Sequence, residues 1–184
     1  MDIAALVILV AIAAYAILIY NRLVKARQTV RESWSGIEVQ LKRRANLIPN
    51  LVETVKGYAA HEKDTLAEVT ESRAAVQRLS GNNVKDRAAA ESLLSQAIGK
   101  LFAVAEDYPD LKANENFIQL QGSLETAENE IQMSRRYFNG AVKQLNVLIE
   151  SFPSNLIANT FGFQLADYFE LEDPADAAVP QVSF

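Results

Sequence analysis

Residues 3–20 read IAALVILVAIAAYAILIY, a run of 18 residues without a charged side chain. As an α-helix, this run rises about 27 Å, close to the roughly 30 Å hydrocarbon thickness of a bilayer. Tyr20 ends the run, at a position where an amphipathic ring favours the membrane surface. The stretch therefore predicts a transmembrane helix, within an anchor of residues 1–21.

A cleaved signal peptide is the alternative interpretation of the same run. Such a peptide carries basic residues before its apolar stretch, whereas only Met1 and Asp2 precede this one. Basic residues instead follow the run, at Arg22, Lys25, Arg27 and Arg31. We therefore expect an uncleaved anchor, with Met1 outside and the rest of the chain in the cytoplasm. The residues expected to contact lipid headgroups at the membrane interface are Tyr20, Arg22, Lys25 and Arg27.

The composition excludes several classes of protein. The chain of 184 residues is long enough for one domain and an anchor. It has no cysteine, which excludes disulfides, thiolate chemistry and Cys-ligated zinc. Only seven glycines and five prolines argue against a turn-rich β protein. The net charge of −5 argues against binding to nucleic acid, which needs a dominant basic face.

Apolar residues recur in steps of three and four through most of the remaining chain, which predicts helices at 22–57, 62–79, 84–106 and 115–152. The last helix has the clearest seam: Phe117, Leu120, Leu124, Ala127, Ile131, Ser134, Phe138, Ala141, Leu145, Leu148 and Phe152. Short connections force neighbouring helices to be antiparallel. The predicted fold is all-α: the transmembrane helix, then an up-down-up-down four-helix bundle over residues 22–152, with coiled-coil-like long first and last helices.

Local signals divide these helices. Pro153 cannot continue the last helix, and Asn114 is a plausible N-cap for the start of it. Residues 80–83, SGNN, predict a tight turn, and Gly57 suits a helix C-terminus. Pro49 is expected to bend the first helix without ending it, because the apolar period continues past it.

No arrangement of reactive residues is recognisable. His61 is the only histidine, and a zinc-protease helix would need a second one four residues later. Glycine-rich phosphate loops and nucleophile elbows are missing from the sequence. Trp34 lies on the first seam and is interpreted as a core residue. We therefore expect no catalytic, cofactor or metal site and no small-molecule substrate.

Lys42, Arg43 and Arg44 form a basic cluster about 33 Å beyond Tyr20 along a continuous helix. Screening over roughly 8 Å makes attraction to lipid negligible at that distance if the helix is upright. The cluster is therefore expected to contact a partner, or to pair with acidic residues on neighbouring helices.

The tail of residues 153–184 is first rich in aromatic residues and then acidic. So much apolar surface must cap the bundle, touch the bilayer or pack on another subunit. The residues expected at a contact with a second copy are Phe152, Leu156, Phe161, Phe163 and Phe169. The acidic segment from Glu170 onward is expected to be disordered unless a partner holds it.

Several short motifs resemble those of the LemA family. They are Tyr20-Asn21-Arg22-Leu23-Val24, Trp34-Ser35, Val39-Gln40-Leu41-Lys42-Arg43-Arg44, Leu47-Ile48-Pro49-Asn50-Leu51-Val52, Val55-Lys56-Gly57-Tyr58, His61-Glu62, Glu115-Asn116-Phe117, Arg135-Arg136-Tyr137-Phe138-Asn139 and Phe152-Pro153. The resemblance implies a bacterial membrane protein with an extracytoplasmic N-terminus, a helical-bundle domain and no established enzymatic activity. It also implies links, through relatives, with membrane-bound metalloproteases and with magnetosome membranes.

The function expected first is that of a non-catalytic, membrane-anchored scaffold. It would self-associate into a homo-oligomer at the bacterial cytoplasmic (inner) membrane, with membrane lipid and other copies as its partners. The alternative is an adaptor or regulator of another membrane protein, such as a membrane metalloprotease. An undetected hydrolase ranks last, because no acid–base cluster is recognisable.

Overall fold

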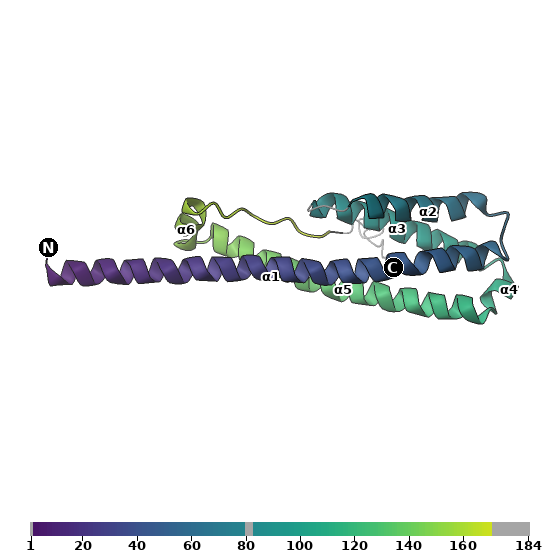
Figure 1. Cartoon of the computed structure of the whole chain (residues 1–184), viewed down its shortest axis with the longest axis horizontal. Helices are drawn as coiled ribbons and strands as arrows, with labels where there is room; N and C mark the ends of the chain where they lie inside the picture. The colour runs from purple at the N-terminus through teal and green to yellow at the C-terminus, as the bar shows by residue number, and fades with distance from the viewer. Residues whose placement is uncertain (1, 80–82, 171–184) are drawn as a thin grey trace, which may run out of the picture. The chain divides into compact units, whose positions relative to one another are not determined.

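The structure is a computed structural model that describes residues 2–79 and 83–170, and every regular element in those ranges is a helix. The helices are α1 (Ile3–Lys56), α2 (Lys63–Arg78), α3 (Val84–Ala105), α4 (Pro109–Lys112), α5 (Glu115–Glu150) and α6 (Ser154–Thr160) (Figure 1). The predicted all-helical class and the long apolar N-terminal helix are confirmed. Residues 80–82 of the predicted turn and 171–184 of the acidic tail lie outside the described residues.

The helix boundaries follow local signals in the sequence. The side-chain oxygen of Asn114 accepts a hydrogen bond from the Phe117 amide at 3.0 Å, so Asn114 caps the start of α5 as predicted. At the end of α1, the Gly57 amide donates to the Glu53 carbonyl at 3.3 Å. Pro49 lies inside α1, which continues through it.

Two short helices were not predicted. Pro109 is the first residue of α4, where its missing amide hydrogen is not needed. Pro153 similarly precedes α6, so the chain resumes a helix soon after α5 ends at Glu150. The apolar run and the first predicted bundle helix form the single helix α1.

The chain divides into two compact units. The anchor unit comprises the described residues of Met1–Glu38 and Met133–Tyr168, and the core unit comprises those of Val39–Gln132 and Phe169–Phe184. Both long helices, α1 and α5, contribute residues to each unit.

The core unit is built around one hydrophobic cluster to which five helices contribute. The fully buried members are Leu51 and Val55 of α1, Val69 of α2, Leu94, Ala97 and Leu101 of α3, and Leu111 of α4. Phe117 and Leu124 of α5 complete the cluster, which is consistent with the predicted seam. Burying each large aliphatic side chain stabilises the fold by roughly 1.5–3 kcal/mol.

In the anchor unit, side-chain packing begins at the end of the apolar run. Residues up to Tyr15 of α1 are exposed, whereas Leu23 is fully buried with Leu145 and Ile149 of α5 and with Phe163. Trp34 packs against Phe138 at 5.3 Å between ring centroids, as expected of a core residue. α6 lies beside α1 in this unit (Figure 1).

The predicted seam of α5 holds for all but its last position. From Phe117 to Leu148 each seam residue is buried or half-buried. Phe152 is 80% exposed, because α5 ends at Glu150 and the backbone turns before the seam reaches it.

Candidate functional site

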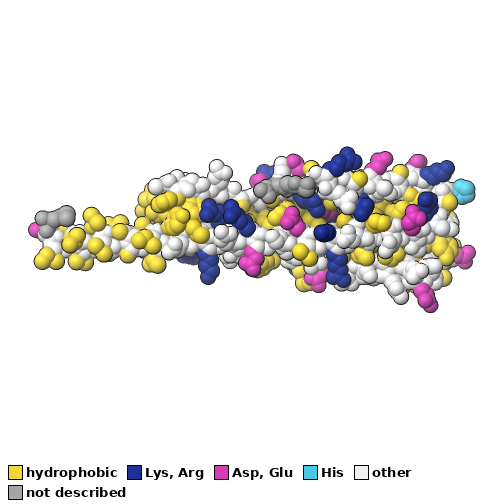
Figure 2. Space-filling model, in the orientation of Figure 1, with side chains coloured by type: hydrophobic (Ala, Val, Ile, Leu, Met, Phe, Trp, Pro, Cys, Tyr) yellow, Lys and Arg dark blue, Asp and Glu magenta, His cyan; other side chains and the backbone are white. Residues whose placement is uncertain are grey.

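Among the described residues, α1 is the one helix long and apolar enough to cross a bilayer. Very little of its apolar window is buried. Apolar side chains cover the visible face of the N-terminal part of α1, and basic side chains lie beyond it (Figure 2). This surface is where lipid contact was predicted.

Tyr20, at the end of the apolar run, belongs to an aromatic cluster. Its ring centroid lies 4.8 Å from that of Phe161 and 5.9 Å from that of Phe163. The segment after α6 therefore returns to the residue that was expected to mark the membrane surface. The aromatic-rich tail therefore packs against the C-terminal end of the apolar run.

The basic residues of the predicted interface fall into two groups. Arg22 and Lys25 are exposed. Arg27 instead places its guanidinium carbon 4.8 Å from the ring centroid of Phe163, and its Nε is buried without a hydrogen-bond partner in the described chain. A cation over an aromatic face is an attractive pair, so Arg27 holds the tail in place.

Asn146 fixes the tail by two hydrogen bonds to one backbone position. Its amide nitrogen donates to the Ala166 carbonyl at 3.0 Å, and the Ala166 amide donates to its oxygen at 2.9 Å. This pair satisfies both the amide and the carbonyl of Ala166, which lies in a segment outside the helices.

The residues predicted for contact with a second copy divide by exposure. Phe152, Leu156 and Phe161 are 80%, 56% and 60% exposed. Phe163 and Phe169 are 7% and 0% exposed, so a partner contact through them does not fit the structure. Their rings cover the protein's own interior, which removes them from the candidate contact.

Arg44 is the centre of a buried ionic cluster in the core unit. Its side chain is 2% exposed, and its Nη2 lies 2.6 Å from Glu91 Oε2, whose side chain is 1% exposed. Its Nη1 donates to Glu128 Oε2 at 2.6 Å and to Ser95 Oγ at 2.7 Å. Arg87 Nε donates to the other oxygen of Glu91 at 2.9 Å. The cluster thus links α1, α3 and α5.

Of the two expectations for the basic cluster, Arg44 follows the second, pairing with acidic residues of neighbouring helices. Partner contact does not fit its burial, whereas Lys42 and Arg43 are exposed. Glu91 and Ser95 were not singled out from the sequence. The burial of Arg44 and Glu91 could have been predicted from spacing, because residues three apart lie on the same face of a helix. Arg44 lies three residues after the seam residue Leu41, and Glu91 lies three residues before Leu94.

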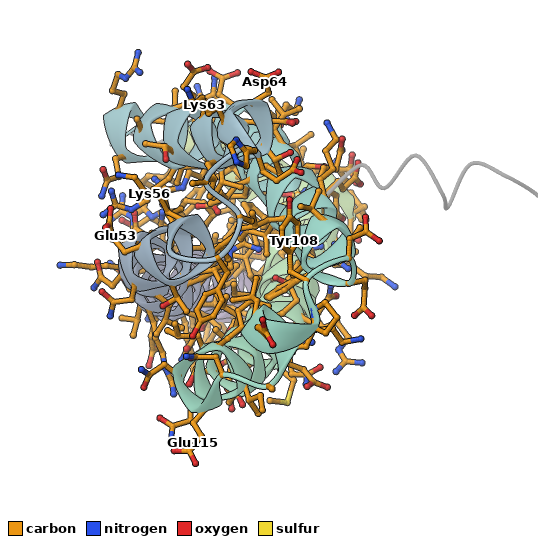
Figure 3. All side chains as sticks on the ribbon, turned by 90° about the vertical axis from the view of Figure 1, so that its right-hand side faces the viewer. Glu53, Lys56, Lys63, Asp64, Tyr108 and Glu115 are labelled. Atoms are coloured by element: carbon orange, nitrogen blue, oxygen red, sulfur yellow. The ribbon has the colours of Figure 1, made fainter. Side chains whose placement is uncertain are left out.

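The end of the core unit where its helices are connected carries charged residues that do not converge. Glu53 and Lys56 neighbour each other on α1, whereas Glu115 points outward at the start of α5 (Figure 3). Tyr108 Oη lies 3.0 Å from Glu62 Oε1. This hydrogen bond, together with burial and the negative charge of Glu62, raises the pKa of Tyr108.

A polar groove of about 440 Å³ lies in the core unit. Its lining brings together two motif residues far apart in sequence, Asn50 and Asn116, with Glu53, Thr54, Gln119, Leu120 and Ser123. Glu53 is the only titratable side chain among them, so these residues contain no acid–base pair. Throughout residues 2–79 and 83–170, no three His, Asp or Glu side chains are grouped to hold a metal ion.

The fold and these sites define a class: a helical protein whose long N-terminal helix is apolar enough to span a membrane and is joined to later helices by a buried ionic cluster. Comparison with known families makes the assignment specific. The chain belongs to the LemA family, whose model matches residues 33–184. All of the motifs quoted above except Tyr20-Asn21-Arg22-Leu23-Val24 lie within the matched residues.

Individual relatives agree with this assignment. The chain is 26% identical over 200 residues to the magnetosome protein MamQ of Magnetospirillum gryphiswaldense, covering 95% of this chain and 74% of that protein. It is 27% identical to the magnetosome protein MamQ 2 of Paramagnetospirillum magneticum, over 92% of this chain and 71% of the relative. With the protein LemA of Metamycoplasma hominis it shares 28% identity, over 75% and 63% of the two chains. None of these names denotes an enzyme.

Proposed function

We propose that this protein is a non-catalytic scaffold, anchored by residues 3–20 of α1 in the bacterial cytoplasmic membrane, whose copies associate side by side. The observation that carries the proposal is the exposure of Phe152, Leu156 and Phe161, the last of which lies beside Tyr20 at the end of the apolar run. Each copy is anchored by the same helix, so all copies are held at one depth in the membrane. This raises the effective concentration of one copy's contact surface near that of the next. Exposed aromatic anchors then supply most of the energy of such a contact.

The proposal includes the arrangement of the helices beyond the membrane. We take α1, α2, α3 and α5 to form an antiparallel up-down-up-down bundle in the cytoplasm. Support comes from the single core to which these helices contribute and from the short connections between them. The basic residues that follow the apolar run support the cytoplasmic side.

The test is the size of the full chain purified in mild detergent. The wild-type protein is expected to elute as a homo-oligomer. Phe152→Ser with Phe161→Ser should dissociate it without loss of helicity, because both side chains are largely exposed and both residues lie outside the helices. The matched control is Val39→Ser with Ile118→Ser, which removes two exposed apolar side chains of the core unit.

The outcomes separate the candidate functions. Dissociation of the Phe152/Phe161 variant alone supports the scaffold. An unchanged assembled mass in that variant rules out the tail as the contact. A monomeric wild-type chain overturns self-association and favours the alternative, an adaptor or regulator of another membrane protein.

A further inference from the structure

A second groove, of about 560 Å³, lies in the anchor unit between α1 and α5. α1 contributes Arg22, Lys25, Ala26 and Thr29, and α5 contributes Lys143, Gln144, Val147 and Leu148. Every charged residue among these is basic, and the positive charges come from both helices. The polar groove of the core unit differs in this respect, because its only charged lining residue is Glu53.

The positive charge of this groove is not compensated within the described chain. The side chains of Arg22, Lys25 and Lys143 form no ion pair or hydrogen bond with described residues, and all three residues are exposed. The nearby Arg27 differs, because its guanidinium lies over Phe163. Several uncompensated cations around one hollow attract an anion strongly.

The remaining lining indicates what kind of anion fits. Ala26, Val147 and Leu148 give the groove an apolar surface beside its basic residues, and Val147 is 49% exposed. A free inorganic anion would leave this apolar surface in water. A ligand with both an anionic group and hydrocarbon would cover it and gain the corresponding burial energy.

The groove also lies at the depth of lipid headgroups. Arg22 and Lys25 follow Tyr20 by two and five residues, so they lie about 3 and 7.5 Å beyond the apolar run. The headgroup layer on each side of a bilayer is roughly 5–8 Å thick. Lys143 is held near this level because Leu145, two residues later, packs in the same cluster as Leu23.

We propose that this groove binds the headgroup of an anionic phospholipid. Lys25 and Lys143 would pair with the phosphate from two sides, and the planar guanidinium of Arg22 would donate two parallel hydrogen bonds to it. The glycerol and the first acyl carbons would lie over Val147 and Leu148. The inference rests on the membrane anchor of the proposed function and not on self-association, since the groove lies within one chain.

The experiment measures lipid binding to the full chain in mild detergent by native mass spectrometry. Dioleoyl phosphatidylglycerol and dioleoyl phosphatidylcholine are supplied at equal concentration, and the former is expected to bind in preference. Lys25→Gln with Lys143→Gln should weaken its binding about fivefold per lysine, and about thirtyfold for both. Arg22, Arg27 and Arg31 remain in this variant, so the topology signal is retained.

The matched control is Lys42→Gln with Arg43→Gln, which removes the same charge from exposed positions of the core unit and should keep wild-type affinity. Val147→Glu tests the groove independently, by adding a carboxylate without removing a cation, and should also abolish the preference. Equal loss in the control and in the Lys25/Lys143 variant would overturn the proposal, because the effect would then be one of net charge.

Two further outcomes also contradict the site. One is equal binding of both lipids to the wild-type chain. The other is full displacement of phosphatidylglycerol by inorganic phosphate at the same concentration, which would make a free anion the ligand. A monomeric chain that keeps the lipid preference would disprove self-association alone, and an assembled chain without the preference would disprove the lipid site alone.

Discussion

Arg44 Nη2 of α1 lies 2.6 Å from Glu91 Oε2 of α3, and both side chains are almost completely shielded from solvent. A buried pair of this kind gives little net stability over well-packed apolar residues. Removing one partner is far more costly, because the other charge is left in the protein interior. The carboxylate of Glu91 is also bound by Arg87, and Arg44 also binds Glu128. The cluster therefore contains four charged side chains.

Replacing Arg44 with Ala should therefore destabilise the chain by about 3–5 kcal/mol, because Glu91 would remain buried without its main partner. Arg43→Ala, one residue away and exposed, should change stability by less than about 0.5 kcal/mol. Chemical unfolding followed by circular dichroism measures both. Similar midpoints for the two variants would show that the cluster is not coupled to folding.

The seam of α5 can be tested at Ile131, which is fully buried. Ile131→Asp places an unpaired charge in the core and should cost on the order of 3 kcal/mol or more. Asn129→Asp changes an exposed position of the same helix and should cost within about 0.5 kcal/mol. Thermal unfolding of the two variants gives the comparison, and equal melting shifts would contradict the assignment of the seam.

Asn146 should control how firmly the tail is held. Asn146→Ala removes both hydrogen bonds to Ala166, which should lower the free energy of local opening by about 1–3 kcal/mol. Deuterium exchange at the Ala166 amide reads this directly, because that amide donates to the Asn146 side chain. Asn159→Ala, exposed on α6, is the control. If exchange at Ala166 is the same in both variants, the side chain does not hold the tail.

The raised pKa of Tyr108 predicts that the folded protein loses stability at alkaline pH. Its pKa is raised above the ordinary value, first by the hydrogen bond to Glu62, so the fold favours the neutral phenol. The stability from this group is fully present below about pH 10 and is lost as the pH rises through the raised pKa of the folded protein. Unfolding measured between pH 8 and pH 11 should show a decline that Tyr108→Phe flattens and that the exposed control Tyr137→Phe leaves unchanged. Identical pH profiles in the wild-type protein and both variants would show that Tyr108 does not cause the decline.

The orientation of the anchor follows from the basic residues after the apolar run. Because the chain has no cysteine, a single cysteine at Asp2 or at Glu71 can be probed without background. In intact spheroplasts, an impermeant thiol reagent should label position 2 and not position 71. The reverse pattern would place the helices outside the cytoplasm.

The fold was largely predictable because it depends on apolar spacing and on chain breakers. The α5 seam from Phe117 to Leu148 needed only the helical period, and Asn114 only the chemistry of a cap. The exposure of Phe152 was not predictable in the same way, because periodicity continues in the sequence past the point where the backbone turns.

The candidate site was less predictable, since it depends on pairs of residues that are distant in sequence. Arg44 was recognised as basic, but its partners Glu91 and Glu128 follow it by 47 and 84 residues. Lys143 lies on a different helix from Arg22 and Lys25, and only the packing of α5 on α1 places it in their groove. The spacing of residues along one helix therefore predicts neither the ionic cluster of Arg44 nor the groove that contains Lys143.

Trp34 is the only tryptophan of the chain, and its contact with Phe138 lies wholly within the anchor unit. Its fluorescence consequently reports on that unit alone, whereas circular dichroism sums over both. A denaturant titration followed by the two signals therefore resolves whether the chain loses its structure in one cooperative step or in two. The protein carries a built-in optical label for the unit that contains its apolar run.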